Sequence, residues 1–134
     1  MDHVAAFGSF AVDDIDVARE FYGRTLGLAV TEAAPGDSSP LWIQGGDGPA
    51  VFVYPKPEHE PAGFTVLNLA VEDLERAVDE LAVRGIVMQQ LDGIPQDKRG
   101  IYHGEGHSMA WFTDPAGNSL SVVKLATTSI AHTP

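Results

Sequence analysis

The sequence predicts an α+β fold built from two βαβββ modules. Residues 10–18 (FAVDDIDVA) recur as residues 69–77 (LAVEDLERA), so that Val12 aligns with Val71 and Asp14 with Asp73. Each copy continues into a stretch of helical periodicity and then into three short strand-like segments. A repeated supersecondary unit is typical of a fold assembled from similar modules.

The helix of each module follows from the spacing of its apolar residues. These recur near the helical period in both copies: Ile15, Ala18, Tyr22 and Leu26 in the first, and Leu74, Ala77, Val78 and Leu81 in the second. Asp14 and Asp73 stand just before these runs, where a carboxylate can cap free backbone N–H groups and meet the positive end of the helix dipole. Gly27 and Gly85 follow the last apolar turns, as helix-ending glycines do.

Short strands follow each helix. We expect them at residues 28–32, 41–44 and 51–54 in module one, and at residues 86–91, 109–113 and 119–124 in module two. The segment DPAGN at residues 114–118 predicts the turn of a closing hairpin, because Pro115 presets φ while Gly117 and Asn118 tolerate positive φ. We therefore expect one domain over residues 1–134, with module one at 7–55, a linker at 56–63, module two at 64–124 and a tail at 125–134.

Composition excludes several classes of function. The chain has 134 residues, of which 44% are hydrophobic and 20% charged, as in an ordinary globular domain. It has no cysteine, which excludes disulfides and cysteine-ligated metals. A formal net charge of −11 disfavours nucleic acid as a partner. No apolar stretch is long enough for a membrane span and no signal-peptide pattern opens the chain, so we expect a cytoplasmic protein without a membrane partner.

Two motifs resemble the glyoxalase/bleomycin-resistance/dioxygenase proteins of the vicinal oxygen chelate superfamily. FAVDDIDVAREFYGRTLGL is similar to the opening of their first module, and WFTDPAGNSLSVV to their closing hairpin. The resemblance covers residues 7–124. It implies that the first strands of the two modules lie side by side, and that the curved mixed sheets form a cleft with the helices outside. Members include glyoxalase I, extradiol dioxygenases, fosfomycin-inactivating thiol transferases and metal-free proteins that sequester bleomycin.

The resemblance also implies where metal ligands would stand. In metal-using relatives, His and Glu side chains occupy positions that correspond here to Phe7, Val53 or a neighbour, Val66 and Ser121. Phe and Val cannot coordinate a cation, and one neutral Ser is a poor ligand. We therefore expect no metal at these positions and no cofactor.

The segment 92–108 is a candidate lid over the cleft. It contains Tyr102, His103, Glu105 and His107 within a glycine-rich stretch. Our interpretation is a flexible loop with exposed histidines, since Gly104 and Gly106 disfavour a helix. The alternative is a non-standard metal or acid–base site made by His103, Glu105 and His107.

Strand alternation indicates which residues line the cleft. The expected set is Phe7, Ser9, Trp42, Gln44, Val53, Val66, Asn68, Trp111 and Ser121. Trp42 and Trp111 either pack in the core or form an aromatic wall for a flat or cationic ligand. Asn68 either braces the junction of the first strands or offers hydrogen bonds to a ligand.

The function predicted from these observations is metal-free binding or sequestration of a small, partly apolar molecule, aromatic or cationic, by a homodimer. The alternative is a glyoxalase-like lyase, isomerase or dioxygenase with its site on the 92–108 loop. An interaction or regulatory module is a third possibility that no residue favours.

Overall fold

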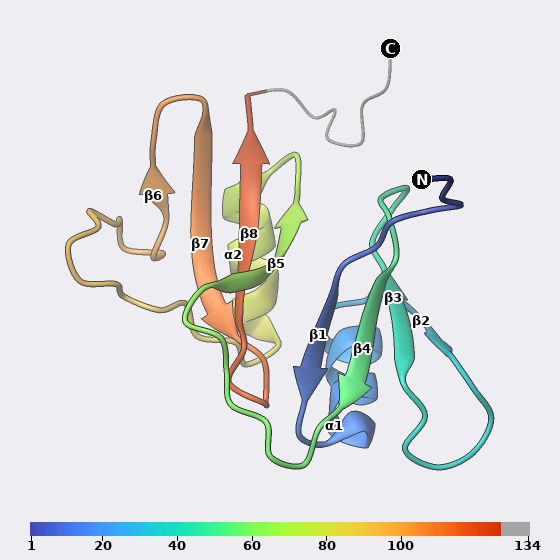
Figure 1. Ribbon diagram of the computed structural model, residues 1–134. Coiled ribbons are helices and arrows are strands. Elements are labelled where there is room, and N and C mark those ends of the chain that lie inside the picture. Colours follow the sequence, from blue (N-terminus) through green and yellow to red (C-terminus); the bar gives the residue numbers. More distant parts are fainter. Residues whose placement is uncertain (127–134) are drawn as a thin grey trace. The chain divides into compact units, whose positions relative to one another are not determined.

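The computed structural model describes residues 1–126, which form two compact units, Met1–Glu60 and a second unit that begins at Pro61. Each unit is described by itself (Figure 1). Most of the tail expected at residues 125–134 lies outside the described residues. Among residues 1–126, no helix is long and apolar enough to cross a membrane.

The first unit is an open four-stranded sheet with one helical segment. In chain order it contains β1 (Ser9–Val12), α1 (Ile15–Glu20), the π-helical segment η1 (Phe21–Thr25), β2 (Ala29–Glu32), β3 (Leu41–Gln44) and β4 (Val51–Pro55). The strand order is β1-β4-β3-β2, with β1 parallel to β4 and the other neighbours antiparallel. This is one βαβββ module.

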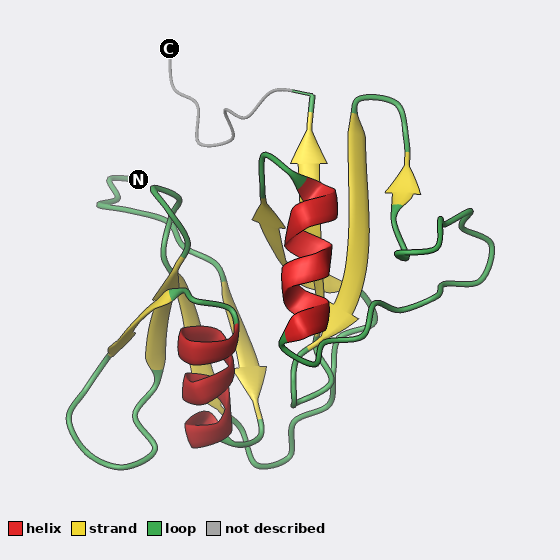
Figure 2. Ribbon diagram, turned by 180° about the vertical axis from the view of Figure 1, so that it is seen from behind, coloured by secondary structure: helices red, strands yellow, loops and turns green. Residues whose placement is uncertain are grey.

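The helical segment of the first unit begins and ends where the sequence predicts. Asp14 caps α1, because its Oδ1 accepts the N–H groups of Asp16 and Val17 at 3.0 and 3.2 Å. Gly27 follows η1 with φ 74°, a backbone conformation that costs glycine little. Figure 2 shows this helical segment over one face of the sheet. The buried apolar residues of this core are Phe10, Val12, Ile15, Ala18, Tyr22, Leu41, Ile43 and Val53.

The second unit repeats the same architecture. It contains β5 (Thr65–Ala70), α2 (Leu74–Val83), β6 (Tyr102–His103), β7 (His107–Thr113) and β8 (Ser119–Leu125), in the strand order β5-β8-β7-β6. Only β5 and β8 are parallel. Asp73 caps α2 by accepting the N–H of Arg76 at 3.1 Å. The core is formed by Leu74, Val78, Leu81, Ile101, Ala110, Phe112, Leu120 and Val122. The predicted α+β fold with two βαβββ modules is confirmed.

The strand predicted at residues 86–91 is wrong. The segment reaches β7 through one backbone hydrogen bond, from Gln89 N–H to the carbonyl of Trp111 at 2.7 Å. The side chain of Gln96 satisfies neighbouring backbone groups instead. Its Oε1 accepts the N–H of Leu91 at 2.7 Å, and its Nε2 donates to the carbonyls of Gln89 and Gly100, each at 2.8 Å. Backbone groups bonded to a side chain are not free to form a strand ladder.

The prediction of a loop throughout residues 92–108 is also wrong in part. Tyr102 and His103 form β6, and β7 begins at His107 rather than at residue 109. The two strands pair in the registers Tyr102–Met109 and His103–Ser108, which leaves a tight connection around Glu105. The end of the expected lid is therefore a β-hairpin, since strand pairing satisfies its backbone groups.

Candidate functional site

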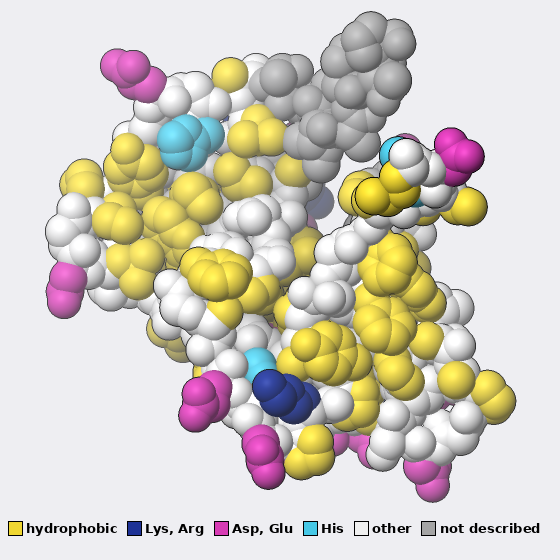
Figure 3. Space-filling view, in the orientation of Figure 1, with side chains coloured by type: hydrophobic (Ala, Val, Ile, Leu, Met, Phe, Trp, Pro, Cys, Tyr) yellow, Lys and Arg dark blue, Asp and Glu magenta, His cyan; other side chains and the backbone are white. Residues whose placement is uncertain are grey.

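One face of the first unit's sheet carries a cluster of aromatic rings, which we call the aromatic face: Phe7, Trp42, Phe52 and Tyr54. Trp42 and Phe52 are register partners on β3 and β4, and their ring centroids lie 5.0 Å apart. Phe7 meets Trp42 edge-on at 4.7 Å, and Tyr54 stacks beside Phe52 at 6.2 Å. Figure 3 shows hydrophobic side chains gathered on this side of the sheet, which α1 does not cover. Phe7 is 57% exposed and Tyr54 37%, so this face is accessible.

The residues predicted for the cleft in this unit divide between the two faces of the sheet. Phe7 and Trp42 belong to the aromatic face, and Ser9 pairs with Phe52 beside them. Gln44 is exposed, and its Nε2 donates to the carbonyl of Gly48 at 2.8 Å within the turn. Val53 is fully buried and shares its face with its register partners Phe10 and Leu41, both core residues. We therefore place Phe52, which the sequence analysis missed, on the candidate site instead of Val53.

The second unit presents a mixed polar and aromatic surface on the side of its sheet away from α2. We call this surface the Asn68 face: Asn68, Tyr102, His107, Trp111 and Ser121. Register pairs place Asn68 and Trp111 on either side of Ser121, while Ala110 and Phe112 point to the buried side. The rings of Tyr102 and Trp111 lie 6.5 Å apart, and those of Tyr102 and His107 5.9 Å.

Asn68 and Ser121 form the polar centre of this face. The hydroxyl of Ser121 donates to Oδ1 of Asn68 at 2.5 Å. Ser121 is fully buried, whereas Asn68 is exposed. Val66, predicted as a neighbour in the cleft, lies at an irregularity in the pairing of β5 with β8 and is half-buried.

His107 has a defined tautomer. Its Nδ1 lies 3.2 Å from the backbone carbonyl oxygen of Glu105, which can only accept, so Nδ1 carries the proton. In the neutral imidazole, Nε2 then presents a lone pair. The ring of Tyr102 packs over Gly104, where an added Cβ would lie 2.7 Å from a ring carbon. A glycine at residue 104 therefore permits this placement of Tyr102 beside His107.

His103 belongs to a different cluster. Its Nε2 donates to Oδ2 of Asp97 at 2.8 Å, while Oδ1 of Asp97 accepts the N–H groups of Arg99 and Ile101, each at 2.9 Å. Burial raises the pKa of the Asp97 carboxyl, but the hydrogen bonds from His103, Ile101 and Arg99 outweigh it and lower that pKa below 3.8.

The two imidazoles therefore do not converge. His103 pairs with Ser108 and His107 with Leu125, and successive residues of a strand alternate between its faces. Within residues 1–126, no three His, Asp or Glu side chains gather in a way that could hold a metal ion. The alternative site made by His103, Glu105 and His107 is not assembled as a ligand set here.

The four positions at which the resemblance implies metal ligands do not fit a metal either. Phe7 contributes a ring to the aromatic face, Val53 is buried in the core, and Val66 has no donor atom. The hydroxyl of Ser121 is the one oxygen among them, and its proton is engaged with Asn68. Cations such as Zn²⁺ are held by imidazole, carboxylate or thiolate groups, which these positions lack.

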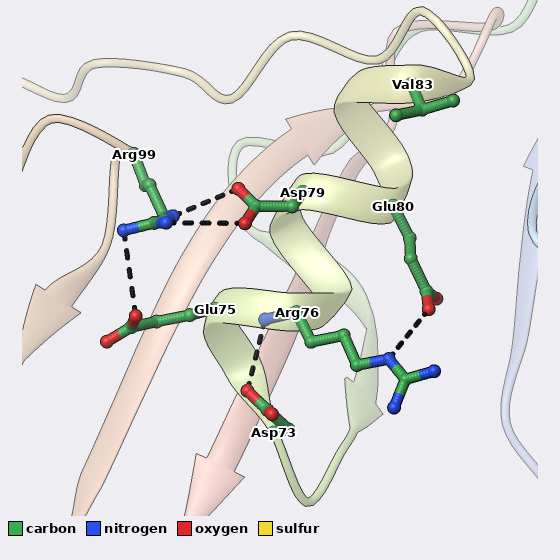
Figure 4. A pocket seen from close by; sticks show the side chains of 7 residues that line it. All are labelled: Asp73, Glu75, Arg76, Asp79, Glu80, Val83 and Arg99. Carbon is green, nitrogen blue, oxygen red and sulfur yellow. Dashed lines mark hydrogen bonds and ion pairs between the residues drawn. The ribbon is translucent and has the colours of Figure 1, made fainter.

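A third feature is a shallow cavity of about 410 Å³ over α2, lined by Asp73, Glu75, Arg76, Asp79, Glu80, Val83 and Arg99 (Figure 4). The basic and acidic side chains of this lining pair with one another. The guanidinium of Arg99 bonds both carboxylate oxygens of Asp79 at 3.0 and 3.3 Å and approaches Glu75 at 3.6 Å. Because Asp79 and Glu75 are already paired with Arg99, we interpret this cluster as exposed ion pairs between the 92–101 segment and α2 rather than as a ligand site. Such pairs contribute little to stability individually.

Comparison with known proteins agrees with this architecture. The chain belongs to the Glyoxalase/Bleomycin resistance protein/Dioxygenase superfamily, whose family model matches residues 1–122. A search of curated proteins found no match.

Several solved structures share the fold. A superfamily member from Sphaerobacter thermophilus is 22% identical, with 90% of this chain and 98% of that chain covered and a TM-score of 0.66. TnmS3, an antibiotic binding protein from Streptomyces sp. CB03234, is 19% identical, with 93% and 99% covered and a TM-score of 0.65. A glyoxalase family protein from Bacillus anthracis is 17% identical, with 93% and 98% covered and a TM-score of 0.65. At these identities the likeness concerns the fold alone.

Proposed function

We propose that this protein binds a small, partly apolar molecule without a metal or other cofactor and without chemistry. The observation that carries the proposal is the aromatic face. Four aromatic rings lie in contact on a sheet surface that no helix of the unit covers, and two of them are substantially exposed. Clustered exposed apolar groups of this kind typically mark a binding surface.

The chemistry of the two faces supports a flat ligand that is neutral or cationic. Aromatic rings bind planar molecules by stacking and cations by their electron-rich faces. The net charge of −11 favours the approach of a cation and opposes that of an anion. The similarity to TnmS3 is in keeping with small-molecule binding, because that protein is described as an antibiotic binding protein.

The proposal includes a homodimer in the cytoplasm that binds neither nucleic acid nor a membrane. Two-fold homodimers are the commonest oligomers of soluble proteins, which supports a second copy of this chain as the partner. Sedimentation equilibrium of the purified protein tests this part, and a monomer at all concentrations would contradict it without touching the binding proposal.

The binding proposal is tested by a screen of planar aromatic molecules, half of them cationic, followed by isothermal titration calorimetry. We expect Trp42→Ala to weaken binding at least tenfold, because the substitution removes the ring that contacts both Phe7 and Phe52. Val17→Ala is the matched control, since Val17 is 44% exposed on α1, which covers the opposite face of the same sheet. Equal affinities of the two variants would contradict the assignment of the aromatic face.

The metal-free part has its own test. Elemental analysis by plasma mass spectrometry of protein without a histidine tag, after mild dialysis, should find no stoichiometric transition metal. One metal per chain, lost on changing His103 and His107 to Ala, would overturn this part of the proposal.

The tautomer of His107 favours a second candidate function, which is proton transfer to or from a bound molecule. Its Nε2 lone pair lies on the Asn68 face beside the Tyr102 ring, so it can act as a base. The test follows deuterium incorporation next to the carbonyl of 1-indanone in D₂O by mass spectrometry. Exchange no faster than in buffer, or unchanged in His107→Ala, would exclude this function for that ketone.

A further inference from the structure

We propose that the Asn68 face selects ligands that carry a carbonyl oxygen, with the amide NH₂ of Asn68 as the donor and Ser121 as the residue that orients it. The inference rests on the proposed binding function and names the chemical class of the ligand at this face. It assigns a specificity-determining role to Asn68 and a positioning role to Ser121.

The hydrogen bond between the two residues fixes which end of the amide is free. An amide carries one acceptor oxygen and one donor nitrogen. Because the hydroxyl of Ser121 donates to Oδ1 of Asn68, the oxygen is engaged and Nδ2 points elsewhere. Among residues 1–126, no acceptor is hydrogen-bonded to this Nδ2. The free group is therefore a pair of N–H donors.

The position of Ser121 favours this orientation of the Asn68 amide. It is fully buried, and on β8 it is the register partner of Asn68 on one side and of Trp111 on the other. A buried hydroxyl cannot form a hydrogen bond with bulk water, so its donation to Asn68 is difficult to replace. Reversing the amide would turn the N–H donors toward Ser121, whose hydroxyl oxygen could accept one of them, and the Oδ1 acceptor outward. The buried hydroxyl proton of Ser121 would then lose its acceptor, so the orientation that presents N–H donors to the ligand is favoured.

The surroundings of Asn68 favour a carbonyl on a flat molecule. Trp111 lies across Ser121 on the same face, and Tyr102 follows at 6.5 Å from Trp111, so a planar ligand can stack there with its edge toward the amide. An acceptor on that edge would meet the N–H donors, whereas a hydrocarbon edge would leave them without a partner. A site whose polar group is left unpaired discriminates against the ligand that lacks the matching atom.

The test compares 1-indanone with indane, which has the same rings without the carbonyl. Affinities are measured by NMR titration of the ¹⁵N-labelled full chain, in which the side-chain amide signal of Asn68 reports directly on the donor. We expect wild type to bind 1-indanone about threefold to tenfold more tightly than indane, as one hydrogen bond provides. We expect that ratio to fall to about one in Asn68→Asp, which replaces the donor by an acceptor of the same shape.

Ser121→Ala separates positioning from simple packing. It should lower the ratio toward one while leaving the affinity for indane nearly unchanged, because only the orientation of the amide is lost. Ser119→Ala is the matched control, since Ser119 lies two residues earlier on the same strand and contacts Thr65 rather than Asn68. Asn68→Ala serves as a second variant that removes the donor without adding a charge.

Each result decides the question. A ratio that collapses in Asn68→Asp, Asn68→Ala and Ser121→Ala but not in Ser119→Ala supports the inference. A wild-type ratio of one, a ratio unaffected by the Asn68 variants, or no binding of 1-indanone overturns it. Hits on the aromatic face from the screen described above would show that the binding proposal survives such a failure, whereas a screen without any hit would remove both.

Discussion

Removing the carboxylate of Asp114 should destabilise the protein strongly. Oδ1 of Asp114 accepts the N–H groups of Ala116 and Asn118 at 3.0 and 2.8 Å, and Oδ2 accepts Nδ2 of Asn118 at 3.0 Å. Asp114 is 4% exposed and Asn118 1%, so water cannot replace these bonds. Asp114→Ala leaves three donors without their charged acceptor. At roughly 1.5 kcal/mol for each such bond, with incomplete additivity, we expect a loss of about 3–5 kcal/mol.

Two further variants sharpen this prediction. Asp114→Asn keeps one oxygen for the two backbone donors but sets an NH₂ group against Nδ2 of Asn118, so we expect a loss of about 1–2 kcal/mol. Asp92→Ala, the same removal of a carboxylate at an exposed turn position, should change stability by less than about 0.5 kcal/mol. The assay is urea unfolding at equilibrium. A loss below about 1 kcal/mol for Asp114→Ala would refute the reasoning that this buried turn depends on its carboxylate.

Three other predictions concern residues 89–101 and the hairpin formed by β6 and β7. Gln96→Ala should cost about 1–3 kcal/mol and accelerate amide exchange between residues 89 and 101, because three hydrogen bonds to the backbone are lost; unchanged exchange would contradict it. The pKa of Asp97 is lowered in the fold, so its stabilisation is present above about pH 4 and is lost as the pH falls through the folded pKa, below 3.8. The stability difference between wild type and Asp97→Asn should therefore be constant above about pH 4 and shrink as the pH falls below it in urea unfolding, and a difference that does not shrink would be evidence against the role of the His103 hydrogen bond. Gly104→Ala should displace the Tyr102 ring at a cost of about 1 kcal/mol, visible as changed ring signals of Tyr102 by NMR, whereas wild-type ring signals would show that the close approach is not limiting.

Local signals in the sequence predicted much of the fold. Asp14 and Asp73 cap the two helices as expected, and the DPAGN turn forms through the side chain of Asp114. Each of these features depends on a few neighbouring residues, so a single sequence contains the information. The strand predicted at residues 86–91 fails because Gln96, outside the segment, bonds its backbone groups. The sequence of residues 86–91 contains no periodic pattern that reports this interaction with Gln96.

The membership of the candidate site stays a prediction, but one step of it can be compared with the strand register. Alternation put Trp42 on the face away from Leu41 and Ile43, as the pairing of β3 with β4 shows. It did not identify Phe52, although the alternation of residues 51–54 contains the signal, since Phe52 and Tyr54 share a parity opposite to that of Val53. The expected role of all these residues in one cleft stays a prediction.

The sequence by itself determined the class of fold, because the repeat, the capped helices and the turn residues are local properties with a fixed period or spacing. Tertiary structure decided what the candidate site offers chemically. The donor presented by Asn68 depends on the hydroxyl of Ser121, 53 positions later in the chain, and the lone pair of His107 depends on a backbone carbonyl in the hairpin. Such contacts arise only when strands pair, because pairing brings groups from distant parts of the chain within hydrogen-bonding distance.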